Sequence, residues 1–182
     1  MRRALLALMT QVCSAAALAD APVPPPAMLP TPYSAEQIRD AWQPGFRVEM
    51  KTTEAGTETL QRMTVLSVTP ETGTIRNEKL AANGELSEPP LEFEAKWTEL
   101  RDHARFPEAS ATRERAECRS QLGAQPGWRY EIAQQGGAAL TMCFADATPG
   151  PPVEWEMRRG GALVSRTEHV SYRRPIGAEE KR

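Results

Sequence analysis

Apolar and polar residues alternate with a period of two over much of the sequence, and this pattern restricts the fold more than any other feature. Alternate side chains of a strand point to opposite faces of a sheet, so each alternating segment predicts a strand with one buried and one solvated face. Such strands are typical of antiparallel sheets, because parallel sheets are usually buried on both faces. The alternation is cleanest at residues 46–51, 91–97, 128–132, 140–144 and 153–158.

Turn signals separate the alternating segments. Asn83-Gly84, Gly136-Gly137 and Gly160-Gly161 are typical of tight hairpin turns. We therefore predict a mainly β protein, in which about eight to nine antiparallel strands form an up-and-down meander that curves into a sheet or partial barrel. The weaker strands of this prediction fall at residues 60–68, 74–80, 111–118 and 163–173.

A short helix is predicted ahead of the strands. Ser34 and Gln37 have the spacing of a capping box, and a Pro-Gly pair follows where the helix should end. Ile38 and Trp42 fall on one face of this helix, so we expect it to pack on the sheet. Residues 98–104 break the period of two and predict one or two further helical turns.

The first 19 residues have the layout of a cleaved signal peptide. Arg2 and Arg3 precede an apolar run at residues 4–19, and small residues end it, which predicts cleavage after Ala19. A membrane anchor is disfavoured because the run is shorter than the roughly 20 residues that span a bilayer. Lipid attachment at Cys13 is disfavoured because the residues before it are not small. We expect a periplasmic or secreted protein with no membrane span after cleavage.

The remaining chain divides by composition into three parts. Residues 20–32 are rich in proline, which lacks a backbone donor and fixes φ, so they predict an extended leader. A spacer is the favoured role of this leader, and recognition of its polyproline conformation is the alternative. The predicted β domain covers residues 33–174, and a polar tail covers residues 175–182.

Removal of the signal leaves two of the three cysteines, Cys118 and Cys143. Thiols in an oxidising compartment usually pair, so we predict a disulfide between them. Closing a loop of this length stabilises the fold by roughly 3.5 kcal/mol on the chain-entropy estimate. A redox-active pair is the alternative, and the absence of a Cys-x-x-Cys motif disfavours it.

Charge and motifs exclude several classes of function. Removal of the signal takes away two arginines and no acid, which changes the net charge from −2 to −4, and nucleic acid is not a natural partner of such a chain. His103 and His169 lie far apart without other ligands nearby, so we predict no metal site. His103 is interpreted as part of a charged cluster at the end of a short helix, and His169 as solvent-facing. Glu92 and Glu94 share a polar strand face and are interpreted as solvated charges rather than a glycosidase pair. We predict no catalytic residue and no cofactor.

Four aromatic residues lie on the apolar phase of their strands and should line the concave side of the sheet: Trp97, Trp128, Phe144 and Trp155. If the helix and the opposing side chains fill the concavity, these residues are core. If part of it stays open, they line a pocket for an acyl chain or another apolar ligand.

Residues 31–41, 97–107 and 143–153 resemble a family of uncharacterised exported bacterial proteins, and the resemblance spans about residues 31–173. No activity is attached to that family. More distantly, a helix followed by a meander is similar to the half-barrels of periplasmic lipoprotein carriers and related lipid-binding envelope proteins.

These observations support three hypotheses of function. The first is a non-catalytic envelope protein that binds an apolar ligand or a lipidated partner in its concave sheet. The second is a structural or protein-interaction module of the cell envelope, with another envelope protein as partner. The third is a hydrolase without a recognisable motif.

Overall fold

The computed structural model describes residues 25–81 and 83–174, so the predicted signal peptide, the start of the leader and the polar tail lie outside the described residues. Within this part of the chain the structure has two short α-helices, a 3₁₀ turn and nine strands. In chain order these are α1 (Ala35–Ala41), β1 (Arg47–Glu54), β2 (Thr57–Val68), β3 (Thr72–Leu80), β4 (Leu91–Lys96), α2 (Trp97–Asp102), β5 (Ala111–Ser120), β6 (Gly123–Ala133), η1 (Gln135–Gly137), β7 (Ala138–Ala145), β8 (Glu154–Arg159) and β9 (Ala162–Arg173).

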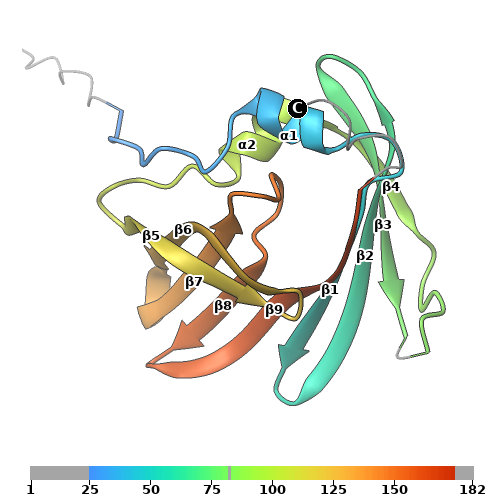
Figure 1. Cartoon of the computed structure of the whole chain (residues 1–182). Helices are drawn as coiled ribbons and strands as arrows, with labels where there is room; N and C mark the ends of the chain where they lie inside the picture. Colours follow the sequence, from blue (N-terminus) through green and yellow to red (C-terminus); the bar gives the residue numbers. More distant parts are fainter. Residues whose placement is uncertain (1–24, 82, 175–182) are drawn as a thin grey trace, which may run out of the picture.

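All nine strands belong to one antiparallel sheet, with the order β4-β3-β2-β1-β9-β8-β7-β6-β5. Its two halves face each other, and the two helices lie between them at one end (Figure 1). The predicted mainly β fold, with a curved antiparallel sheet and a short N-terminal helix, is confirmed. The sheet is not closed, because β4 and β5 are its two edges and a helical segment rather than a hairpin joins them.

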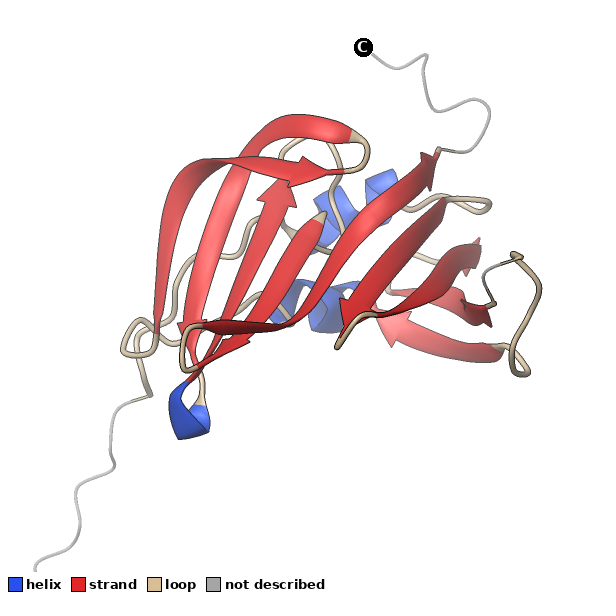
Figure 2. Cartoon of the chain, turned by 90° about the horizontal axis from the view of Figure 1, so that it is seen from below, coloured by secondary structure: helices blue, strands red, loops and turns tan. Residues whose placement is uncertain are grey.

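The first and last strands, β1 and β9, pair with each other in the middle of the sheet. This pairing joins strands β1–β4 to strands β5–β9, so the two groups of strands form one continuous sheet. Seen from below, the strands curve in front of the two helices (Figure 2). The concave side is therefore the covered side of the sheet.

The polar residues that alternate with apolar ones along the strands lie on the convex face, where some of them form ion pairs. Arg62 on β2 contacts Glu49 on β1 at 2.8 Å (Nε to Oε1) and Glu78 on β3 at 3.6 Å (Nη1 to Oε2). Pairs of this kind, partly open to solvent, contribute only about 0–1 kcal/mol each. The apolar phase, which includes Val48 and Met50 of β1, is buried on the concave side.

The capping box predicted for the first helix is present in α1. The Ser34 hydroxyl accepts a hydrogen bond from the Gln37 backbone N–H at 3.2 Å, and the Ser34 N–H donates to Gln37 Oε1 at 2.8 Å. These bonds satisfy backbone groups that the helix itself leaves open. The second predicted helical segment corresponds to α2, which packs against α1.

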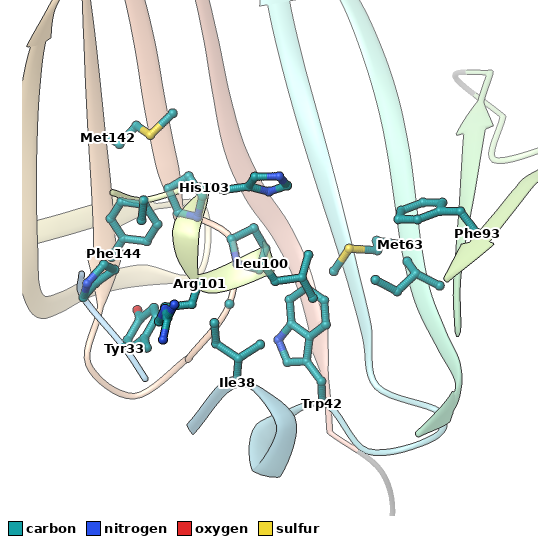
Figure 3. A pocket seen from close by; sticks show the side chains of 16 residues that line it. Tyr33, Ile38, Trp42, Met63, Phe93, Leu100, Arg101, His103, Met142 and Phe144 are labelled. Carbon is teal, nitrogen blue, oxygen red and sulfur yellow. The ribbon is translucent and has the colours of Figure 1, made fainter. Parts of the chain in front are cut away.

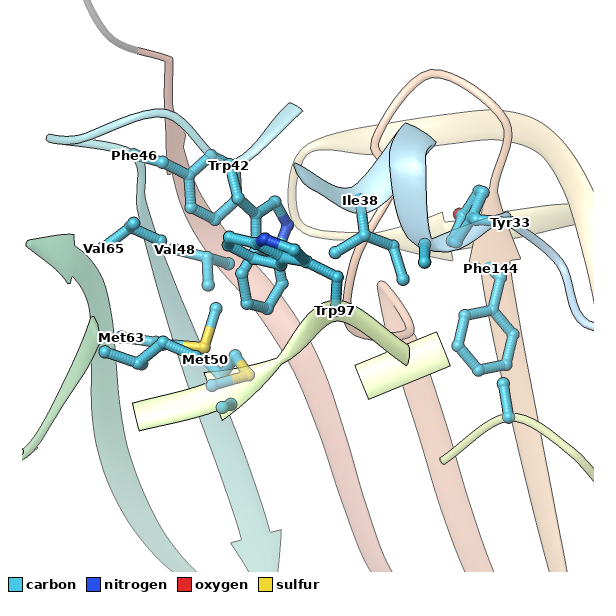
Figure 4. Close-up of a cluster of buried hydrophobic side chains, with 14 of the residues drawn as sticks. Tyr33, Ile38, Trp42, Phe46, Val48, Met50, Met63, Val65, Trp97 and Phe144 are labelled. Atoms are coloured by element: carbon cyan, nitrogen blue, oxygen red, sulfur yellow. The ribbon is translucent and has the colours of Figure 1, made fainter. Parts of the chain in front are cut away.

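Two tryptophans form the centre of the core between the halves of the sheet (Figure 4). The Trp42 ring stacks on Phe46 with centroids 5.4 Å apart and meets Trp97 edge-on at 6.4 Å. The Trp97 indole N–H donates to the Thr69 carbonyl at 3.0 Å. Gly73 on β3 leaves the space for this indole, since a Cβ there would overlap the Trp97 ring. The helices are therefore fixed to the sheet through large aromatic contacts.

The predicted disulfide between Cys118 and Cys143 is confirmed, with a Cα–Cα distance of 5.4 Å. It joins β5 to β7 across the intervening strand β6. Gly127 of β6 lies directly beneath the disulfide, because a Cβ at this position would approach the Cys118 sulfur to 2.8 Å. The sequence pattern did not reveal this role of Gly127, which depends on the pairing of β6 with β5 and β7.

The interpretation of His169 as solvent-facing is wrong, since only 1% of the residue is exposed. Strand β9 is central, and its register places His169 opposite Met50 and Thr167 opposite Thr52 on the covered face. Burial lowers the pKa of His169 from 6.5 to about 4, so the side chain is neutral at neutral pH.

Candidate functional site

A hollow of about 280 Å³ lies between the concave side of the sheet and the two helices (Figure 3). Residues from both halves of the sheet contribute to it, together with the N-terminal segment, both helices and the loop between β7 and β8. Apolar side chains dominate its wall, chiefly Ile38, Trp42, Met63, Phe93, Met142 and Phe144. The hollow is therefore an apolar space within the curved sheet.

One side of the hollow is held in place by hydrogen bonds from aromatic side chains to the β7–β8 connection. Trp42, directly after α1, donates from its indole N–H to the Pro149 carbonyl at 2.8 Å, and a side chain at Gly150 would overlap the Trp42 ring. The Tyr33 hydroxyl donates to the Ala145 carbonyl at 2.6 Å. Burial raises the pKa of Tyr33 well above 10, so Tyr33 acts as a neutral donor.

Residues 27–31 of the predicted leader lie against the domain close to the helices. The Leu29 N–H donates to the Phe106 carbonyl at 2.9 Å, and the Tyr130 hydroxyl donates to the Pro30 carbonyl at 2.6 Å. This segment therefore forms part of the cover at the helical end of the sheet.

Two positively ionisable side chains complete the wall, Arg101 at the end of α2 and His103 just after it. Arg101 Nε donates to Asp102 Oδ1 at 2.8 Å, and this hydrogen bond lowers the pKa of the exposed Asp102. Among the described residues that line the hollow, none is Asp or Glu. The positive charge of Arg101 thus has no acidic counterpart in this wall.

The apolar surface continues from the hollow toward the open edge of the sheet. Phe93 lines the hollow from strand β4 and is 37% exposed, and Leu91 of the same strand is 63% exposed. Phe93 pairs with buried Ile75 on β3, and Leu91 pairs with half-buried Asn77, so both side chains face the concave side. Large apolar side chains exposed beside a pocket often mark a contact surface.

Of the four aromatic residues predicted for the concave side, Phe144 lines the hollow. Trp97 is 2% exposed and lies in the core against Trp42. Trp128 packs against the guanidinium groups of Arg113 and Arg115, whose Cζ atoms are 3.5 Å and 4.7 Å from its ring centroid. Trp155 is partly buried against the core.

The sequence pattern missed the residues that the two helices bring to the hollow. Ile38 was placed on an apolar helix face, and His103 was interpreted as part of a charged cluster at a helix end. Their joint position depends on how α1 and α2 pack between the halves of the sheet. No periodicity in the sequence encodes that arrangement.

Membrane-spanning helices and grouped metal ligands are both missing from the described part of the chain. No helix in it is both long enough and apolar enough to cross a membrane. Within residues 25–81 and 83–174, no three His, Cys, Asp or Glu side chains are grouped as metal ligands would be.

The fold and the hollow define a class of architecture: an open, curved antiparallel sheet with helices against its concave face. No known family matches the sequence, and no curated protein matches it. Among solved structures, the chain is similar to one in the Pseudomonas aeruginosa MucA/MucB complex, with a TM-score of 0.51 and 12% identity over 76% of this chain and 55% of that one.

MucB in complex with MucA(peri) gives a comparable match, with a TM-score of 0.51 and 12% identity over 78% of this chain and 53% of that one. An uncharacterised conserved protein from Thermus thermophilus matches with a TM-score of 0.48 and 16% identity over 77% and 84% of the two chains. The chain thus spans a little over half the length of the MucB-related chains. At these identities the likeness concerns the fold alone.

Proposed function

We propose that the protein is a non-catalytic binding protein of the cell envelope that takes an apolar ligand, or the acyl chain of a lipidated partner, into the hollow. The observation that carries this proposal is the apolar hollow of about 280 Å³ in the concave sheet. An apolar cavity of about 150 Å³ binds benzene, and small-ligand pockets begin near 300 Å³. The hollow therefore has the size of a site for a small apolar ligand.

The lining residues favour binding over catalysis. The ionisable side chains among them are Tyr33, Arg101 and His103, and Tyr33 is held neutral in a hydrogen bond to the backbone. The described residues of this wall offer no pair of carboxylates for general acid–base chemistry. The disulfide and the fold shared with MucB support a location outside the cytoplasm.

Titration with the neutral fluorescent probe N-phenyl-1-naphthylamine tests the proposal. Saturable binding to the wild-type protein is expected, and it should weaken at least about tenfold in Ala104→Leu, because the larger side chain fills part of the hollow. Ala109→Leu is the matched control, since Ala109 is exposed and does not line the hollow.

Circular dichroism and thermal unfolding of Ala104→Leu establish whether the variant is folded. Should overpacking unfold it, Met142→Trp fills the same hollow from a half-buried position on β7. A wild-type protein that does not bind the probe, or folded filling variants that bind it as tightly as the wild type, would contradict the proposal.

A second candidate function is a protein-interaction module of the envelope. The observation in its favour is that MucB, which shares the fold, has been solved in complex with MucA(peri). The exposed Leu91 and Phe93 on edge strand β4 are the surface that such a partner would contact. Cross-linking pull-down of the wild type and of Leu91→Ser tests it: a specific envelope protein recovered only with the wild type supports this function, and equal recovery contradicts the role of the edge.

A further inference from the structure

Arg101 brings a positive charge to the hollow without an acidic partner in the wall, and this restricts the ligand more than the apolar wall does. Arg101 and His103 supply donors, and the described lining residues include neither Asp nor Glu. The chain as a whole carries a net charge of −2, so this local excess of positive charge runs against the overall balance. A ligand with a negative group would be attracted here, and a cationic one would meet no counter-charge.

Arg101 lies at the mouth of the hollow. It lines the hollow and also a shallow surface depression beside residues 28–31, and its side chain is 34% exposed. Its Nε donates a hydrogen bond to Asp102 Oδ1 at 2.8 Å. A guanidinium has five N–H donors, and no hydrogen bond within the described residues engages its terminal nitrogens. Arg101 thus uses one donor on Asp102 and retains others for a second acid.

Two acids act on Arg101, Asp102 and Glu36, and neither lines the hollow. Both acids therefore lie outside the wall of the hollow. His103 extends over the middle of the hollow, between Met142 on one side and Met63 on the other (Figure 3). A histidine ring donates at least one N–H in either charge state, so His103 adds a second donor to the wall, apart from Arg101, which lies beside Tyr33 (Figure 3).

The volume limits the apolar part of the ligand to one chain. A cavity of about 150 Å³ holds the six carbons of benzene, so a hollow of 280 Å³ encloses about 10–12 carbons, and the remaining atoms of a larger ligand, such as one ring of the probe, would extend through its mouth. A two-chain lipid would need about twice that space.

We propose that the ligand is a fatty acid whose single alkyl chain enters the hollow and whose carboxylate is held at the mouth by Arg101, with His103 as a further donor along the wall. This inference rests on the proposed binding function and names the ligand class of the same site. Charge-assisted hydrogen bonds to a carboxylate are stronger than neutral ones, so the head group should determine which amphiphiles are preferred.

Competition against the neutral probe N-phenyl-1-naphthylamine tests the head group directly. Dodecanoate, 1-dodecanol and dodecylamine have the same chain length and differ in charge. At about pH 8 we expect dodecanoate to displace the probe at concentrations at least about tenfold lower than the other two. Dilauroyl phosphatidylglycerol, with two chains, should compete poorly.

The double variant Arg101→Gln/His103→Gln should lose the preference for dodecanoate and keep the affinity for the neutral probe. Arg129→Gln is the matched control, because Arg129 lies in register with Cys143 on the opposite face of the sheet, outside the hollow. Equal displacement by acid and alcohol, an unchanged preference in the double variant, or competition by the two-chain lipid as strong as by dodecanoate would overturn the inference. If the wild type binds neither the neutral probe nor dodecanoate, the proposed binding function itself is overturned.

Discussion

Removal of the disulfide should destabilise the protein by about 3.5 kcal/mol. The cross-link joins residues separated by 25 positions, and the chain-entropy estimate for a loop of this length gives about 3.5 kcal/mol at room temperature. The position of the disulfide in the sheet adds to its importance for stability. Strand β5 is an edge strand that pairs only with β6, and the disulfide is its covalent link to β7.

The double variant Cys118→Ala/Cys143→Ala measures this contribution. Alanine is the appropriate replacement because both residues are buried, and serine would place two hydroxyl groups where the sulfurs lie. Guanidinium unfolding gives the loss in free energy, and the midpoint of thermal unfolding should fall by about 7–14 °C for a domain of this size.

Wild-type protein in excess dithiothreitol is the control for side-chain volume. If the cross-link is the cause, the reduced wild type and the double variant should lose the same stability. A loss below about 1 kcal/mol in both would refute the reasoning, because it would mean that the unfolded chain is not restricted by the bond.

Three further predictions concern the core and its cover. Gly73→Ala should lower the free energy of unfolding by about 1–3 kcal/mol in urea, since the new Cβ overlaps the Trp97 ring, and unchanged stability would contradict the packing described. Folding lowers the pKa of His169 from 6.5 to about 4, so the unfolded state binds the proton first as the pH falls through this window. Stability should therefore be full above about pH 6.5 and decrease by about 3 kcal/mol toward about pH 4, and urea unfolding of His169→Leu should lack this component of the pH dependence. Tyr130→Phe removes the hydrogen bond to the Pro30 carbonyl, and faster amide exchange in the segment around Pro30 is expected; exchange at the wild-type rate would show that the bond does not hold the cover.

The fold class was predictable because it depends on local patterns. Val48 and Met50 alternate with Glu49, and the structure buries the first two and pairs the third with Arg62 on the convex face. The capping box at Ser34 is equally local, since its partners lie three residues apart. Such features need only neighbouring residues and water to determine them.

The candidate site was predictable only in part. Phe144 was correctly assigned to the apolar phase of its strand, and it lines the hollow. Trp97 was also assigned to the apolar face of its strand, but it lies in the core, because Gly73 leaves space for its ring. The alternation along a strand shows on which face of the sheet a side chain lies. Whether that side chain packs against another or lines a cavity depends on how the opposing elements pack.

By itself, then, the sequence determined the antiparallel strands, the short helix and the cysteine pair. The tertiary structure alone decided that β1 and β9 join the two halves of the sheet, that His169 is buried, and that Arg101 and His103 share a hollow with Phe144. The physical reason is the range of the interactions. Alternation, capping and turns act within a few residues, whereas a cavity is what remains after side chains distant in the sequence have packed against one another.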